Sequence, residues 1–124
     1  MRIPVVVCVD DEPAILAALR RVLRDEPYRV LTTERPDEAM DWILAENAEL
    51  VLADQRMPGM TGLQLLELVQ ACSPATIRVL LSGQSDLSGI LETTKLAAIQ
   101  RLVRKPWDSE ELKATIRELL QRAA

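Results

Sequence analysis

The sequence contains no histidine, and this absence excludes more chemistry than any other feature of the composition. Histidine is the general base of Ser-His-Asp nucleophilic sites and a frequent zinc ligand. Any chemistry of this chain must therefore depend on carboxylates, hydroxyls and lysine, together with a hard cation where a metal is needed.

Aromatic residues are also scarce, because the sequence has two tryptophans, one tyrosine and no phenylalanine. The core must therefore be aliphatic, and platforms on which bases could stack are poorly supplied. A formal net charge of −4 argues against direct nucleic-acid binding, which usually requires a basic surplus.

No apolar run approaches the roughly 20 residues of a transmembrane helix, and the first residues lack the pattern of a signal peptide. We therefore expect a cytoplasmic protein that does not associate with a membrane. Cys8 and Cys72 are not expected to pair in that compartment. With 124 residues and an apolar fraction of 48%, the chain is predicted to form one domain over residues 1–124.

Short apolar runs alternate with amphipathic helical patterns along the chain. Strands are predicted at residues 5–9, 28–33, 50–53, 77–81 and 101–104. A helix is predicted after each strand, and the one at residues 85–98 has the lowest propensity because of Gly89, Thr93 and Thr94. Five strands that are each followed by a helix indicate a parallel sheet with right-handed crossovers.

The polarity of the strands suggests their order in the sheet. The first, third and fourth are almost entirely aliphatic, as expected where helices cover both faces. The second and fifth carry Arg29, Thr32, Arg101 and Arg104, which suits the two edges. We therefore predict an α/β fold, a doubly wound five-stranded parallel sheet of the flavodoxin-like (βα)5 type. Its strand order is 2-1-3-4-5, and its ligand site lies at the carboxyl ends of the first and third strands.

Polar residues follow four of the predicted strands, at the rim where the carboxyl ends of parallel strands meet. They are Asp10-Asp11-Glu12, Asp54, Ser82-Gly83 and Lys105-Pro106, after the first, third, fourth and fifth strands. Crowded carboxylates repel each other, by roughly 4 kcal/mol for a pair about 4 Å apart at an effective dielectric near 20. A divalent cation with oxygen ligands relieves this repulsion, and Mg²⁺ needs only one or two carboxylates, a carbonyl and a phosphate oxygen.

The remaining groups at this rim suit a phosphoryl group. Lys105 would supply a compact positive charge opposite the metal. Ser82 can donate a hydrogen bond to a phosphate, and Gly83 lets its main-chain amide approach closely. For the acidic triplet alone, a helix cap with a favourable charge at a helix N-terminus is the simpler interpretation. Because Asp54 and Lys105 are predicted to reach the same rim, a metal and phosphate site is favoured.

These motifs together resemble the receiver domain of two-component response regulators over essentially the whole chain. The matching segments are Val9-Asp10-Asp11-Glu12, Asp54-Gln55-Arg56-Met57-Pro58-Gly59-Met60-Thr61-Gly62, Leu81-Ser82-Gly83 and Lys105-Pro106-Trp107. One segment alone would be a weak signal, whereas four in this order and at these spacings are highly specific.

The resemblance implies that Asp54 is the phosphoacceptor and takes its phosphoryl group from a phosphohistidine of a sensor histidine kinase or a phosphotransfer protein. It also implies that Asp10, Asp11, Asp54 and the main-chain carbonyl of Arg56 hold Mg²⁺, with Mn²⁺ as an alternative ion. The implied role is that of a regulatory phosphoacceptor, not an enzyme, although the domain assists its own phosphorylation and dephosphorylation.

For the response to phosphorylation, the resemblance implies that Lys105, Ser82 and Gly83 contact the phosphate, that Ser82 is the switch hydroxyl and that a cis peptide bond precedes Pro106. The family usually has a tyrosine or phenylalanine three residues before the lysine, whereas this sequence has Leu102. Leucine has no ring to rotate inward, so the switch would act through Ser82 and the fourth helix. It would control an output domain in cis or a partner protein, and a dimer that forms on phosphorylation is a further option.

Three other functions stay open at this point. A phosphatase of the haloacid-dehalogenase kind uses similar groups, but it needs an Asp-x-Asp arrangement after the first strand, which Asp10-Asp11-Glu12 does not match. A flavodoxin-like flavin binder needs a hydroxyl- and glycine-rich loop there, where three acids would repel the flavin phosphate. The third is a receiver that keeps the fold but is never phosphorylated, which the presence of Leu102 suggests.

Overall fold

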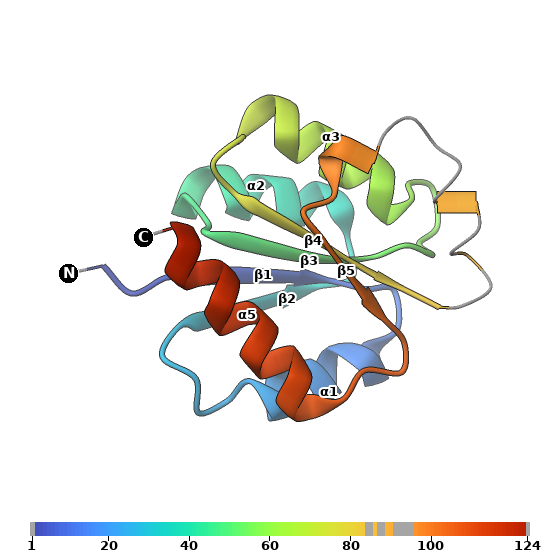
Figure 1. Ribbon diagram of the computed structural model, residues 1–124. Coiled ribbons are helices and arrows are strands. Elements are labelled where there is room, and N and C mark those ends of the chain that lie inside the picture. Colours follow the sequence, from blue (N-terminus) through green and yellow to red (C-terminus); the bar gives the residue numbers. More distant parts are fainter. Residues whose placement is uncertain (1, 84–85, 87–88, 91–95, 124) are drawn as a thin grey trace.

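The computed structural model describes residues 2–83, 86, 89–90 and 96–123, and it contains a parallel sheet with helices on both faces (Figure 1). The strands are β1 (Val5–Val9), β2 (Arg29–Thr33), β3 (Leu50–Asp54), β4 (Ile77–Ser82) and β5 (Arg101–Arg104). The helices are α1 (Pro13–Val22), α2 (Pro36–Glu46), α3 (Gly62–Cys72) and α5 (Ser109–Ala123), with a 3-10 turn, η1, at Leu96–Ala98.

The strand order is β2-β1-β3-β4-β5 and each neighbouring pair is parallel, so the predicted fold is confirmed. The three central strands are buried along their whole length, whereas β2 and β5 are partly exposed at the edges. The predicted strand bounds are correct to within one residue: β2 begins at Arg29, and β3 and β4 extend to Asp54 and Ser82.

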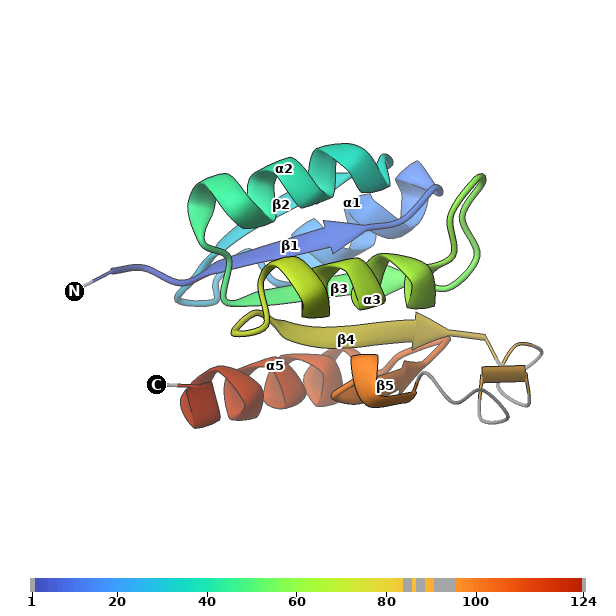
Figure 2. The same ribbon diagram turned by 90° about the horizontal axis from the view of Figure 1, so that it is seen from above.

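Two apolar layers hold the helices against the sheet, with α2 and α3 on one face and α1 and α5 on the other (Figures 1 and 2). Alternate side chains of β1 point into different layers. Val5, Val7 and Val9 pack with the α2 and α3 residues, and Val6 and Cys8 pack with those of α1 and α5. This alternation explains why the central strands read as continuous aliphatic runs in the sequence.

The helices begin where the sequence places their start signals. Pro13 and Pro36 occupy the first turns of α1 and α2, where a missing amide hydrogen has no consequence. Thr61 and Gln64 form a complete capping box at the start of α3, with the Gln64 amide 3.1 Å from Thr61 Oγ1. Each signal fixes the point at which a loop from the carboxyl edge of the sheet enters a helix.

The fourth helix, predicted over residues 85–98, lies largely outside the described residues. Its last three positions, Leu96–Ala98, form η1 instead of α-helix. At this point Arg78 Nε donates a hydrogen bond of 2.8 Å to the Ala98 carbonyl. The Ala98 carbonyl therefore accepts its hydrogen bond from a side chain of β4, at the point where the chain turns into β5.

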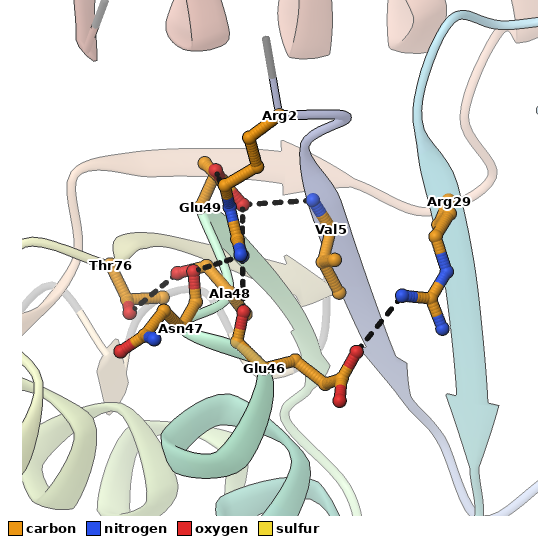
Figure 3. Close-up of polar contacts among 8 residues, drawn as sticks. All are labelled: Arg2, Val5, Arg29, Glu46, Asn47, Ala48, Glu49 and Thr76. Atoms are coloured by element: carbon orange, nitrogen blue, oxygen red, sulfur yellow. Dashed lines mark hydrogen bonds and ion pairs between the residues drawn. The ribbon is translucent and has the colours of Figure 1, made fainter.

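At the amino ends of the strands, opposite the predicted site, a polar network ties the start of the chain to the loop before β3 (Figure 3). Arg2 Nε lies 2.9 Å from Glu49 Oε2, and the Val5 amide donates to Glu49 Oε1 at 2.8 Å. Arg29 on β2 pairs with Glu46 at the end of α2 at 2.9 Å. The two contacts of Glu49 hold the start of β1 against the loop before β3. Within the described residues, no helix combines the length and the apolar character needed to cross a bilayer.

Candidate functional site

The carboxyl ends of four strands, marked by the arrowheads in Figure 1, bring Asp10, Asp54, Ser82 and Lys105 to the same end of the sheet. Lys105 Nζ lies 3.3 Å from Asp10 Oδ2 and also forms an ion pair with Asp54 Oδ1. One ammonium group therefore joins carboxylates that lie 44 residues apart in the chain, at the ends of neighbouring strands β1 and β3.

These charged groups are largely removed from solvent. Asp10 is fully buried, Asp54 is 3% exposed and the Lys105 side chain is 19% exposed. Burial raises the pKa of Asp10, and the negative charge of Asp54 adds to this increase. Burial by itself would lower the pKa of Lys105, but the hydrogen bond to Asp54 and the charges of both aspartates outweigh it and raise that pKa. Lys105 is therefore held as a cation.

A cluster of carboxylates lies beside this ion pair. Asp10, Asp11 and Glu12 each offer an oxygen, and these oxygens lie within 4.8 Å of one another. The Glu12 amide donates to Asp10 Oδ1 at 2.9 Å, which turns the chain from β1 into α1 and holds the Asp10 side chain in place. Glu12 was not among the predicted metal ligands. Its position directly after Asp10 and Asp11 is the feature of the sequence that could have indicated it.

The loop after β3 is fixed by Gln55, a residue whose type does not indicate this role in the sequence. Its main-chain amide donates to the Leu81 carbonyl at 2.9 Å, and its side-chain Oε1 accepts from the Leu63 amide at 3.0 Å. Gly62 donates to the Gln55 carbonyl at 3.1 Å. The start of α3 is thereby held against the end of β3, which carries Asp54.

Gly62 must be glycine for a steric reason. A Cβ atom at this position would overlap the carbonyl oxygen of Asp54 and would lie only 2.7 Å from Leu80 Cδ1. A Cβ at Gly83 would meet no atom within 4 Å, so there is no steric requirement for glycine at that position. Close packing around Asp54 therefore depends on Gly62.

The end of β4 connects to the end of β5 through the main chain. The Lys105 amide donates to the Ser82 carbonyl at 2.9 Å, and the fully buried Ser82 hydroxyl donates to the Gly83 carbonyl at 3.1 Å. The peptide bond between Lys105 and Pro106 is cis. Leu102 is partly buried, lies beside Leu80 in the sheet and packs on the α2 and α3 layer.

A second charged pair lies at the rim of the site. Arg56 Nε donates to both carboxylate oxygens of Asp86, at 2.9 and 3.0 Å. The two residues border a groove together with Asp11 of the acidic cluster. Its lining residues are Asp11, Gln55, Arg56, Met57, Pro58, Thr61 and Asp86.

The donors at this edge fit a hard divalent cation. Two buried carboxylates share the single ammonium group of Lys105, and Asp11 and Glu12 add further carboxylate oxygens beside them. The sequence has no histidine, and Cys8 and Cys72 do not belong to this group. An all-oxygen set of this charge suits Mg²⁺ or Mn²⁺ and not a soft metal.

Comparisons with known proteins agree with this arrangement. The model of the response regulator receiver domain family matches residues 6–117. The hydrogenase transcriptional regulatory protein HoxA of Cupriavidus necator is 39% identical over 116 residues, which are 94% of this chain and 24% of that protein. The chain thus spans about a quarter of the length of HoxA, since only 24% of that protein is matched.

Solved structures of receiver domains superimpose closely on the chain. The signal receiver domain of an HD domain-containing protein from Pseudomonas fluorescens Pf-5 has a TM-score of 0.90 and 30% identity, with 99% of this chain and 90% of that chain covered. The response regulator TrrA from Thermotoga maritima, solved in complex with Mg²⁺ and BeF, has a TM-score of 0.83 and 28% identity, with 94% and 99% covered. Sequence, fold and the grouping of acids with one lysine thus agree, and the chain belongs to the response regulator receiver domain family.

Proposed function

We propose that the chain is a phosphorylation switch in which Asp54 accepts a phosphoryl group from a phosphohistidine of a sensor kinase or a phosphotransfer protein. The observation that carries the proposal is the position of Lys105, whose ammonium group contacts both Asp54 and Asp10 at a buried edge of the sheet. A buried carboxylate beside a fixed cation suits nucleophilic attack on a phosphorus atom.

In the proposed transfer, a carboxylate oxygen of Asp54 attacks the phosphorus atom and forms a phosphorus–oxygen bond. The phosphorus–nitrogen bond of the donor breaks, and its electron pair stays on the imidazole nitrogen. The ring leaves as neutral imidazole, with a proton that its other nitrogen already carries or that it takes up from solvent. Lys105 would pair with the negative charge that the phosphoryl oxygens carry. Asp10, Asp11 and Asp54, with the main-chain carbonyl of Arg56, would hold Mg²⁺. When bound, the ion offsets the charge between the carboxylates and the incoming phosphoryl group.

The conformational response is proposed to begin at Ser82. Its hydroxyl, which donates to the neighbouring Gly83 carbonyl in this structure, would turn to the phosphate. A hydrogen bond to a charged group contributes about 1.5–3 kcal/mol, which is enough to shift a two-state equilibrium roughly 10- to 150-fold. Leu102 leaves this response without an aromatic partner.

The phosphorylated domain is proposed to act in the cytoplasm on an output domain in cis or on a separate protein, without binding nucleic acid itself. HoxA is named as a transcriptional regulatory protein and is about four times as long as the part that matches, which is 24% of its length. A receiver attached to a longer regulator is therefore the arrangement that the comparison supports.

Labelling with acetyl phosphate in the presence of Mg²⁺ tests the proposal. We expect the intact protein to gain the mass of one phosphoryl group, and Asp54→Asn to gain none while keeping its circular dichroism spectrum. Phosphate on Asp10 would instead indicate chemistry of the haloacid-dehalogenase kind. A folded wild-type protein that neither reacts nor binds Mg²⁺ in the millimolar range would be a receiver that is never phosphorylated.

A further inference from the structure

The ion pair between Arg56 and Asp86 joins the loop after β3 to a helical residue beyond β4, and the proposed switch would move these two parts relative to each other. Arg56 lies two residues after Asp54, and Asp86 lies four residues after Ser82. The Nε atom of Arg56 is bonded to both carboxylate oxygens of Asp86, at 2.9 and 3.0 Å. The pair therefore links the loop of the acceptor residue to the segment that follows the switch hydroxyl.

The two members of this pair differ in exposure. The Arg56 side chain is 71% exposed, whereas that of Asp86 is 20% exposed. Both border the groove that Asp11 of the acidic cluster also lines. Because its side chain is mostly exposed, Arg56 can exchange this partner without crossing the core.

Phosphorylation of Asp54 would introduce a stronger competitor for this arginine. A phosphoryl group carries about −1.5 to −2 charges at neutral pH and three acceptor oxygens, compared with the single charge of Asp86. The planar guanidinium group binds phosphate oxygens in a bidentate manner more readily than an ammonium group does. The pairing of Arg56 with Asp86 should therefore depend on whether Asp54 is phosphorylated.

We propose that the Arg56–Asp86 ion pair restrains the unphosphorylated form, and that Arg56 leaves Asp86 for the phosphoryl group when Asp54 is phosphorylated. The inference rests on the proposed function, because it requires a phosphoryl group on Asp54. Release of Asp86 would remove this ion-pair link between Asp86 and the loop after β3. This step needs no aromatic ring at position 102, where the chain has Leu102.

Titration with beryllofluoride at saturating Mg²⁺, followed by calorimetry, measures this competition. Asp86→Asn removes the competing carboxylate, so we expect the apparent Kd for beryllofluoride to fall roughly 1.5- to 5-fold, the range that an exposed ion pair provides. The matched control is Asp37→Asn, which makes the same change of charge in an exposed pair with Arg35 of 2.9 Å. The control should bind beryllofluoride as the wild type does.

The same substitution in an Arg56→Gln background separates the ion pair from a general effect of charge. If Asp86 acts by holding Arg56, Asp86→Asn changes nothing in that background. An equal gain in both backgrounds, or no gain in the wild-type background, would overturn the inference. Thermal unfolding of each variant shows that it is folded before titration.

The outcome for the wild-type protein keeps this inference separate from the proposed function. If the wild type does not bind beryllofluoride with Mg²⁺, the proposed function itself is wrong. If it binds and Asp86→Asn does not differ from the Asp37→Asn control, only the role of the ion pair is wrong.

Discussion

Tyr28 has a side chain that buries a polar atom in an apolar layer. Its ring packs in the layer formed by α1 and α5, and it is 8% exposed. Among the described residues its hydroxyl has no hydrogen-bond partner. Burial raises the pKa of this phenol, so the group is neutral and still carries an unsatisfied polar atom.

Tyr28→Phe should therefore stabilise the protein. The change removes the unpaired hydroxyl and keeps the ring, so we expect the free energy of unfolding to rise by about 1 kcal/mol. Urea denaturation followed by circular dichroism measures it. Tyr28→Leu, which also removes the ring, serves as the control and should destabilise. A Phe variant less stable than the wild type would show that the hydroxyl is paired in solution.

A second prediction concerns the effect of a single added methyl group at Gly62. A methyl group there overlaps the carbonyl oxygen of Asp54 and approaches Leu80 Cδ1. Gly62→Ala should lower the free energy of unfolding by roughly 1–3 kcal/mol, as overpacking does in other cores, although alanine favours helix. Gly83→Ala, which meets no atom within 4 Å, is the matched control for stability. Equal stability of the two variants would argue against the predicted overlap.

At the scale of elements, one ion pair joins the loop after α1 to α5. Arg117 Nε and Nη2 donate to the two carboxylate oxygens of Glu26, both at 2.7 Å. The Glu26 side chain is only 6% exposed, whereas that of Arg117 is 54% exposed. The hydrogen bond from Arg117 is the main cause of a pKa for Glu26 below its ordinary value. This pair holds the last helix against the first half of the chain.

Glu26→Gln should destabilise the protein by about 1 kcal/mol near pH 7, because it weakens a bidentate pair. A carboxyl whose pKa is lower in the folded state stabilises the fold above its unfolded pKa, and that contribution is lost as the pH falls through the folded pKa. The difference between wild type and variant should thus be constant near neutrality. It should shrink as the pH falls below about 4.5, the ordinary value for this carboxyl. Unfolding curves at several pH values test this, and a difference that grows on acidification would contradict it.

The positions of the strands in the sheet could be predicted from the sequence. Continuous aliphatic runs placed β1, β3 and β4 at the centre of the sheet, because burial on both faces leaves no polar alternation. The burial of Arg78 could not be predicted from the sequence, because arginine usually lies at the protein surface. In the structure it is 6% exposed and donates to the carbonyls of Ala98, Pro74 and Thr76. Such partners are main-chain atoms, which have no residue-type signal in the sequence.

At the scale of the whole molecule, topology decides which parts of the site could be predicted. Parallel strands place all their carboxyl ends at one edge, so the meeting of Asp10, Asp54 and Lys105 follows once strand order is known. The contacts of Gln55 and the pairing of Arg56 with Asp86 depend on loop conformation, to which no periodicity applies. The charged residues at the strand ends were therefore easier to predict than the residues whose contacts fix the loops.

Lys105 connects the site to the stability of the entire domain. Without a metal its ammonium group is the cation that joins Asp10 and Asp54, both of which are buried. Lys105→Ala leaves two buried carboxylates without this partner, and loss of one member of a buried pair typically destabilises by about 3–5 kcal/mol. We expect a variant of markedly lower stability when a chelator is present.

Mg²⁺ should recover part of that loss, because a divalent cation also offsets the charge of the two carboxylates. Binding to the folded state alone stabilises by about 2.7 kcal/mol when the ligand is at 100 times its Kd. The melting temperature of Lys105→Ala should therefore rise more on addition of Mg²⁺ than that of the wild type, in which the metal and the ammonium group act on the same carboxylates. Lys113→Ala, which removes a lysine paired with the exposed Glu110, is the control and should respond as the wild type does. An equal increase in all three proteins would mean that Lys105 and the metal act on separate groups.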